Sequence, residues 1–262
     1  MVVSGSLPRL IGLVLLLAAC GPSESFRPGL PIDGSAALLR ASDRRMRAGL
    51  IRDAAAARGI RSGYLLAGIA DAETNMCHCW SELTWACQGP LSPDCGGGPV
   101  VAGKYDGDCA AEQGGLGMFQ FDAGDYADTL MREGERILTI DGNIQAAIDF
   151  VLAMLVRSSH VEVDDDACAS DFMNDTRVDG MNWDAWVSSV THHYNGCRPN
   201  ADCWMTRYAY YADHTRAVYE EMGEEFWQLD EQQPSLAGTN APPSAAGGVA
   251  RACRTSGLQL RG

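Results

Sequence analysis

The sequence predicts a mainly α-helical domain that carries a small β-hairpin or loop lobe stapled by disulfides. Three observations lead to this fold class. Apolar residues recur at helical spacing along much of the chain, strand-like alternation is weak, and one stretch rich in Gly, Cys and Pro interrupts the helical pattern at residues 77–115. The 262 residues are enough for one well-sized core with flexible ends.

The N-terminal residues 1–19 are typical of a bacterial export signal. Arg9 precedes an apolar run from Leu10 to Ala19, which is too short to span a bilayer. The run ends in Leu17-Ala18-Ala19-Cys20, which resembles the lipobox of bacterial lipoproteins, whose Cys becomes the acylated first residue. The alternative is an ordinary secretory signal followed by a chance Cys.

Gly21, rather than Asp, follows the predicted lipidated Cys20. By analogy with lipoprotein sorting in Gram-negative bacteria, this favours the outer membrane, with the domain facing the periplasm. Lipid chains anchor a protein through their buried methylenes. A secreted or cell-surface location is the alternative.

The remaining chain divides into a tether, a domain and a tail. Residues 20–41 are rich in Gly and Pro and predict a tether. The domain is expected over residues 42–228, with helices at 42–57, at a segment ending in Glu73, and at 125–135, 141–157, 183–194 and 201–222. Ser42 is the expected cap of the first helix. Residues 229–262 turn to Gln, Pro, Ser, Ala and Gly, which predicts a disordered C-terminal tail.

The cysteines predict disulfides. Apart from Cys20, eight lie in the expected domain and Cys253 lies in the tail; the eight are Cys77, Cys79, Cys87, Cys95, Cys109, Cys168, Cys197 and Cys203. An even set of eight in an exported domain indicates up to four disulfides, with pairing left open. The alternative is a metal site at Cys77-His78-Cys79 with Cys87, but its spacing is not the usual C-x₂-C pattern.

Glu73 is the first candidate catalytic residue. Leu65, Leu66, Ile69 and Glu73 share one face of the predicted helix, so an acid lies on an apolar stripe. Burial disfavours the ionised carboxylate, and a carboxylic acid that stays protonated near neutral pH is able to act as a general acid. The alternative is a Glu that reaches solvent from the helix end.

Two further segments accompany Glu73. One is Gly114-Gly115-Leu116-Gly117-Met118-Phe119-Gln120-Phe121-Asp122, and the other is His193-Tyr194-Asn195-Gly196. In order and spacing the three segments resemble the lytic transglycosylase and goose-type lysozyme superfamily over residues 42–222. Its members carry a Glu at a helix end, a G-L-M-Q-like turn and a Y-N-x-G-like motif. The resemblance implies a lysozyme-like fold and cleavage of the MurNAc–GlcNAc β-1,4 bond of peptidoglycan.

The resemblance also implies roles for individual residues. Glu73 would be general acid and then base, giving a 1,6-anhydro-muramoyl product in a lytic transglycosylase. The implied substrate-binding residues are Gly117, Met118, Gln120, Tyr194, Asn195 and a tyrosine of the last helix. That helix has three tyrosines, Tyr208, Tyr210 and Tyr211, and we take Tyr208 and Tyr211 as the candidates. Gln120 is expected either to orient the substrate by hydrogen bonds or to have a structural role. Met118 is expected to form part of the wall of the site or of the hydrophobic core.

A second carboxylate would favour hydrolysis. Inverting hydrolysis needs a base across the sugar ring with space for water. Asp122 matches the goose-type position, whereas the other acid expected before the glycines has no clean match; Asp106, Asp108 and Glu112 are nearby candidates. Asp122 is therefore a predicted assisting carboxylate in the hydrolytic alternative. A third alternative is an inactive peptidoglycan-binding module.

Other classes of function are disfavoured. A formal net charge of −14 argues against nucleic acid as a partner. His192 and His193 have no HExxH-type partner and the acidic clusters do not fit an EF-hand, so no metal and no cofactor is predicted. Three aromatic residues flank the expected cleft, and we expect them either to stack on sugar rings or to form a small core beneath disulfides; they are Trp80, Trp85 and Tyr105. We expect a monomer whose partners are glycan strands and, through the N-terminal lipid, a membrane.

Overall fold

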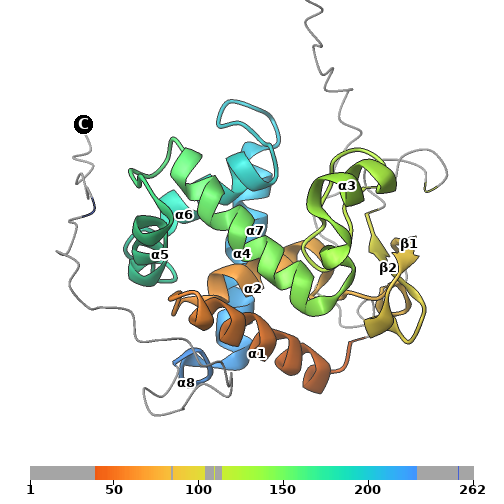
Figure 1. The fold of residues 1–262 in the computed structure, drawn as a ribbon. Coiled ribbons are helices and arrows are strands. Elements are labelled where there is room, and N and C mark those ends of the chain that lie inside the picture. Colours follow the sequence, from red (N-terminus) through yellow and green to blue (C-terminus); the bar gives the residue numbers. More distant parts are fainter. Residues whose placement is uncertain (1–38, 84, 104–108, 110–113, 229–252, 254–262) are drawn as a thin grey trace, which may run out of the picture. The chain divides into compact units, whose positions relative to one another are not determined.

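The computed structural model describes residues 39–83, 85–103, 109, 114–228 and 253. The predicted signal, Cys20, most of the tether and the tail apart from Cys253 lie outside these residues. The described part is mainly helical with one two-stranded antiparallel sheet, so the predicted fold class is confirmed (Figure 1). Over the same part, no helix combines the length and the apolar character that crossing a bilayer requires.

The predicted helices are present with small shifts in their bounds. The helices are α1 (Ala41–Ala57), α2 (Gly63–Thr74), α3 (Tyr126–Glu133), α4 (Ile140–Arg157), α5 (Asp166–Asp175), α6 (Trp183–Ser189), α7 (Trp204–Met222) and α8 (Glu224–Trp227). Ser42 does not cap α1, because the helix begins one residue earlier and Arg40 is its N-cap residue. The predicted helix 183–194 is divided, since α6 passes into a π-helical turn, η4 (Val190–Tyr194).

Helix α5 was not predicted. It begins at the last residue of the acidic run Asp164-Asp165-Asp166, for which the sequence favours a solvated loop. In the structure Asp165 is the N-cap, and its carboxylate accepts a hydrogen bond from the Cys168 backbone N–H at 2.8 Å. The acids therefore begin a helix, as expected where carboxylates meet free N–H groups and the positive end of the helix dipole.

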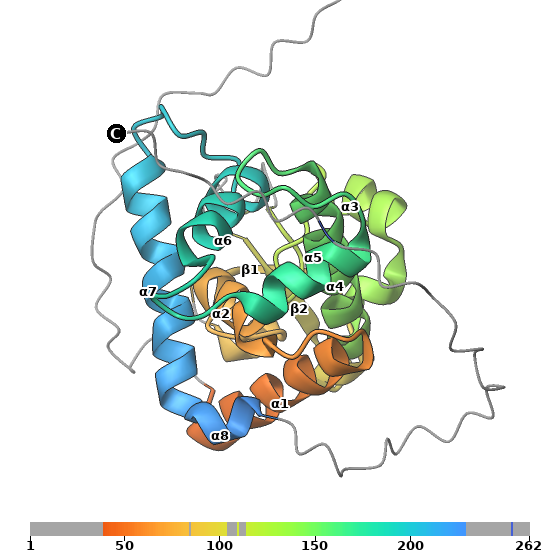
Figure 2. The ribbon, with the colours of Figure 1, turned by 90° about the vertical axis from the view of Figure 1, so that its left-hand side faces the viewer.

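Helix α2 lies at the centre of the core. Every residue of α2 except Glu73 is buried. The helix packs against α1 and α7, and Figure 2 shows it beside α7 with α1 below. The sequence predicted burial along one face of this helix only. Because α2 is buried on all sides, it is an interior helix.

The contact between α2 and α7 depends on Gly68. A Cβ built on Gly68 would lie 2.1 Å from Thr215 Oγ1 and 2.6 Å from Thr215 Cα. Only a glycine permits this approach, because the obstructing atoms include the backbone of α7.

We expect Gly68→Ala to destabilise the fold by at least about 2 kcal/mol, since an added methyl forces the two helices apart. Urea unfolding monitored by circular dichroism gives the value. Gly49→Ala on α1 is the matched control, because its Cβ would meet only Phe226 Cζ at 3.9 Å. The control should be neutral or stabilising by up to about 1 kcal/mol through helix propensity. Equal effects of the two variants would contradict the packing argument.

The small lobe consists of β1 (Cys87–Leu91) and β2 (Pro99–Ala102), with the short helices η1 (Trp80–Glu82) and η2 (Pro93–Cys95). The strands pair antiparallel, Cys87 opposite Ala102 and Gln88 opposite Val101, with an irregularity before Leu91. Trp80 and Trp85 pack on a small cluster formed by Cys77, Leu83, Ala86 and Val101. This packing agrees with the alternative of a small core. Tyr105 lies outside the described residues.

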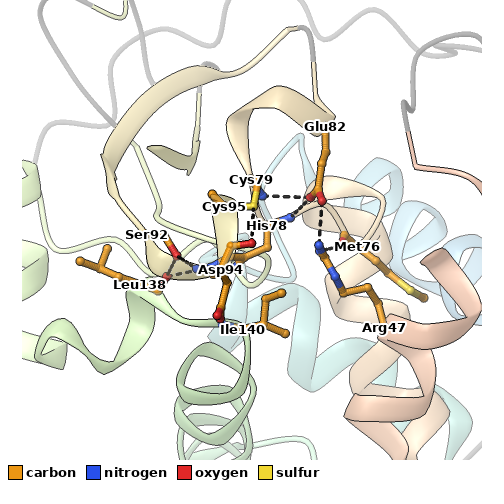
Figure 3. The surroundings of a disulfide bond; sticks show 10 residues. All are labelled: Arg47, Met76, His78, Cys79, Glu82, Ser92, Asp94, Cys95, Leu138 and Ile140. Carbon is orange, nitrogen blue, oxygen red and sulfur yellow. Dashed lines mark hydrogen bonds and ion pairs between the residues drawn. A yellow bond between two sulfur atoms is a disulfide. The ribbon is translucent and has the colours of Figure 1, made fainter. Parts of the chain in front are cut away.

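Two polar contacts fasten this lobe to the helices (Figure 3). On one side, the Glu82 carboxylate accepts hydrogen bonds from the backbone N–H groups of His78 and Cys79 and forms an ion pair with Arg47 at 2.7 Å. On the other side, Asp94 Oδ2 accepts the first N–H of α4, from Ile140, at 2.7 Å. An acid at this point also interacts favourably with the dipole of α4.

Four disulfides are present, but two of the predicted cysteines were assigned wrongly. The pairs are Cys79–Cys95, Cys87–Cys109, Cys168–Cys253 and Cys197–Cys203. Cys77 is a free cysteine, and its buried thiol donates to the Glu82 carbonyl oxygen at 3.3 Å. Cys253, assigned to the tail by composition, takes the eighth position. The alternative metal site is excluded by the pairing of Cys79 and Cys87.

We expect iodoacetamide to alkylate Cys77 only after unfolding. Burial raises the pKa of the Cys77 thiol to about 12, so the reactive thiolate is scarce as well as inaccessible. Peptide mapping without reductant, before and after denaturation, measures the labelling. Rapid labelling of Cys77 in the native protein would contradict both the burial and the assigned pairing.

Candidate functional site

Glu73 lies in the last turn of α2 and is the partly buried member of an otherwise buried helix. The helix ends because Asn75 adopts the left-handed conformation with φ of 52°. Next to Glu73, the Thr74 hydroxyl donates a hydrogen bond to the Met118 carbonyl at 3.0 Å. The end of α2 is thus joined directly to the glycine-rich segment.

The glycine-rich segment forms a tight turn against the lobe. Leu116 and Phe121 exchange backbone hydrogen bonds at 2.8 and 3.2 Å, and Gly117 N–H donates to Val101 O at 2.9 Å. Gly117 has φ of 72°, and a Cβ there would lie 2.4 Å from Asn143 Nδ2. Glycine is required at this position by conformation and by space together.

Asn143 holds this turn from α4, and it was not among the predicted site residues. It is fully buried, accepts the Phe119 N–H at 3.0 Å, and donates to the carbonyls of Leu116 and Ile137. Its signal was a polar residue within an apolar helical pattern, which is expected to be hydrogen-bonded when buried.

Tyr194 connects the third motif to the second. Its hydroxyl donates to the Phe119 carbonyl at 2.5 Å. Tyr194 is the last residue of η4, and Asn195 N–H closes the π-turn on Val190 O at 3.1 Å. Asn195 therefore lies at the end of the turn that positions Tyr194.

The structure distinguishes among the three tyrosines of α7. The Tyr211 hydroxyl donates to Glu73 Oε1. Tyr210 instead donates to the Ala72 carbonyl at 2.6 Å, and Tyr208 donates to Asp184 Oδ1 at 2.7 Å. Of the two chosen residues, Tyr211 contacts the predicted acid, whereas Tyr208 is bound to a side chain of α6.

Both tyrosines near Glu73 remain neutral. Burial, reinforced by the negative charge of Glu73, raises the pKa of Tyr194 and of Tyr211 well above the ordinary value for a phenol. The hydroxyl group that binds Glu73, that of Tyr211, is therefore neutral. A hydroxyl both donates and accepts hydrogen bonds, so it suits a carboxyl group in either protonation state.

Other predicted residues have mainly local contacts. Gln120 Nε2 donates to the Gly117 carbonyl at 2.7 Å, which fits the structural alternative for Gln120. Met118 is fully buried, as expected for wall or core. Asp122 is exposed, and its carboxylate accepts the Gly124 N–H at 2.8 Å. Asp106, Asp108 and Glu112 lie outside the described residues.

A buried charge network lies behind the site and was not predicted. Asp71 accepts from Arg44 Nη1 at 2.8 Å and contacts His214 Nδ1 at 2.6 Å. Arg44 also pairs with Glu221 at 2.7 Å and donates to the Asn75 carbonyl. Buried charges persist where they are paired, and this network fixes the end of α2 to α1 and α7.

Two groups of side chains have potential metal-ligand geometry within the described residues. One is His160, His192 and His193, and the other is Asp164, Asp165 and Cys168. Cys168 is committed to a disulfide, so its sulfur is not a thiolate ligand. A hollow of about 330 Å³ is lined by Leu50, Asp94, Ile140, Asp141 and Ile144, and no predicted site residue lines it.

Comparisons of the chain with protein-family models, with curated proteins and with solved structures each give no match.

Proposed function

We propose that the protein is a peptidoglycan lytic transglycosylase with a lysozyme-like fold. The observation that supports this best is the meeting of the three motifs at Glu73. Thr74 binds the turn at Met118, Tyr194 binds the same turn at Phe119, and Tyr211 binds Glu73 itself. Segments far apart in sequence are thus joined next to Glu73, and one of them supplies a hydroxyl group that binds its carboxyl group.

In the proposed reaction, Glu73 first acts as general acid. It transfers its proton to the oxygen of the MurNAc–GlcNAc bond as the bond to the anomeric carbon breaks and oxocarbenium character develops. Tyr211, a buried residue of α7, holds one carboxyl oxygen in place, so that the geometry of proton transfer is fixed before substrate binds.

Glu73 then acts as base. The carboxylate removes the proton of the muramoyl C6 hydroxyl, and the C6 oxygen bonds to the anomeric carbon to close a 1,6-anhydro ring. The proton that Glu73 gave to the leaving sugar is thereby replaced, and no water is consumed. Tyr211 is neutral, and its hydroxyl is able to accept a hydrogen bond when the carboxyl group is protonated.

The environment of Asp122 guides the choice over hydrolysis. A goose-type hydrolase would use Asp122 to assist water, but this carboxylate is exposed and engaged by the local Gly124 N–H. We therefore place hydrolysis second. With the lipobox-like Cys20, the proposal is an outer-membrane lipoprotein that acts on glycan strands in the periplasm.

We expect the full-length protein to release muropeptides with 1,6-anhydro ends from purified sacculi, as identified by mass spectrometry. Glu73→Gln should reduce the rate by at least about 100-fold, because general acid–base catalysis contributes roughly 10²–10⁴-fold. Glu135→Gln, the same substitution at an exposed glutamate, should retain activity.

Each outcome of this digestion separates the alternatives. Reducing ends would indicate hydrolysis and exclude the transglycosylase. Binding to sacculi without any release, and without an effect of Glu73→Gln, would indicate an inactive binding module. Equal loss in Glu73→Gln and Glu135→Gln would exclude a special role for Glu73.

We expect Tyr211→Phe to slow release roughly 10- to 100-fold, because a hydrogen bond to a charged group contributes about 1.5–3 kcal/mol. Tyr208→Phe is the matched control on the same helix, since its hydroxyl binds Asp184 instead of Glu73. Rates of anhydro-muropeptide release, with circular dichroism to verify folding, test the pair. A larger loss for Tyr208→Phe would show that Tyr208 is the site tyrosine.

A further inference from the structure

Three of the five histidines gather at one point, although they are distant in sequence. His192 and His193 lie in the π-turn η4, and His160 lies three residues beyond the end of α4. One potential ligand nitrogen from each lies within 4.8 Å of the other two, and all three side chains are partly buried. Sequence spacing alone does not reveal this cluster, because His160 lies 32 residues before His192.

We propose that His160, His192 and His193 bind a divalent transition-metal ion of the zinc class, with water in the remaining position. Neutral imidazole is the commonest protein ligand for such ions, and three histidines with one open position is an established arrangement for zinc. The site is independent of the proposed glycan cleavage.

The distances suit this assignment. His160 Nε2 and His192 Nδ1 are 3.1 Å apart. Two nitrogens bound tetrahedrally to one zinc at 2.0–2.1 Å are separated by about 3.3 Å, so this pair has the required spacing. The third nitrogen, within 4.8 Å of the others, needs a shift of at most about 1.5 Å to reach the same separation.

The backbone around the cluster is fixed before any metal binds. Ser158 Oγ and Ser189 Oγ are hydrogen-bonded at 2.8 Å, and His160 N–H donates to Ser158 Oγ at 3.1 Å. The loop after α4 is thereby attached to α6. Trp204 stacks on the His160 ring with centroids 5.9 Å apart, which restricts its rotation. A pre-positioned ligand loses less conformational freedom when it binds an ion.

The π-turn supplies the other two rings. His192 and His193 are adjacent in sequence, and their rings are stacked with centroids 4.0 Å apart. Ser159 N–H donates a long hydrogen bond of 3.4 Å to the single lone pair of His193 Nε2, so an ion that binds this nitrogen displaces that hydrogen bond. Since the same turn ends at Tyr194, a bound ion would join the Tyr194 turn to the loop after α4.

Without an ion, the short His160–His192 contact is a hydrogen bond in which one ring donates and the other accepts. When a metal binds, the donating ring carries its proton on its other nitrogen, so that the two facing nitrogens both offer lone pairs to the ion. The neighbouring acidic group, Asp164 and Asp165, is the rival site. Because carboxylates favour calcium and imidazoles favour zinc, the choice of cation also separates the two sites.

The test is titration of the full-length, chelator-treated protein with ZnCl₂ by calorimetry, and with CoCl₂ by visible absorption. We expect one zinc per chain, the absorption of a nitrogen-ligated tetrahedral cobalt ion, and a rise in melting temperature with zinc but not with CaCl₂. His160→Gln and His192→Gln should each lose more affinity than the roughly 10–100-fold caused by loss of an outer-shell partner.

Two variants serve as controls. His214→Gln removes a histidine that contacts Asp71 outside the cluster, and Asp164→Asn removes an acid of the rival site. Both should bind zinc as the unchanged protein does, and circular dichroism checks that every variant is folded. The absence of zinc binding by the unchanged protein would overturn the proposal, as would binding that survives in both cluster variants or is lost in Asp164→Asn.

Discussion

The fold depends on how the buried helix α2 ends. The last carbonyl groups of a helix have no partner within the helix, and leaving them buried and unpaired is costly. Here Tyr210 of α7 satisfies one of them, since its hydroxyl donates to Ala72 O at 2.6 Å. Arg44 and Arg47 of α1 donate to the carbonyls of Asn75 and Met76, the two residues that follow the helix. Two helices are therefore held against the terminus of the third.

The same constraint positions Glu73. Neighbouring residues of α7 bind neighbouring residues of α2, since Tyr210 contacts Ala72 and Tyr211 contacts Glu73. This correspondence requires α2 and α7 to lie very close together, which Gly68 permits opposite Thr215. A packing requirement in the middle of the helix and a hydrogen-bonding requirement at its end thus determine where the carboxyl group lies.

The sequence predicted the elements better than their partners. Helical periodicity located α1, α2, α4 and α7 within a few residues, because apolar spacing reports directly on burial. It did not reveal that Cys253 reaches Cys168, nor that Tyr211, rather than Tyr208, faces Glu73. Both contacts depend on how distant segments align in three dimensions, which periodicity does not report. Cys253 was assigned to a tail on composition alone. The roles of Asn143 and Asp71 were not predicted either. A polar residue within an apolar pattern is expected to have a hydrogen-bond partner when it is buried, but the sequence does not identify that partner.

The two acids of α2 illustrate how position selects a role. Asp71 is buried and engaged by Arg44 and His214, so its charge is balanced and it serves to hold the helix. Glu73, two residues later, is partly buried and receives the hydroxyl of Tyr211. A guanidinium only donates hydrogen bonds and favours the ionised carboxylate, whereas a phenol hydroxyl also accepts one from a protonated carboxyl group. A group that gives up a proton and then takes one back needs partners that tolerate both states. Of the two acids, the contacts of Glu73 suit that cycle and those of Asp71 oppose it.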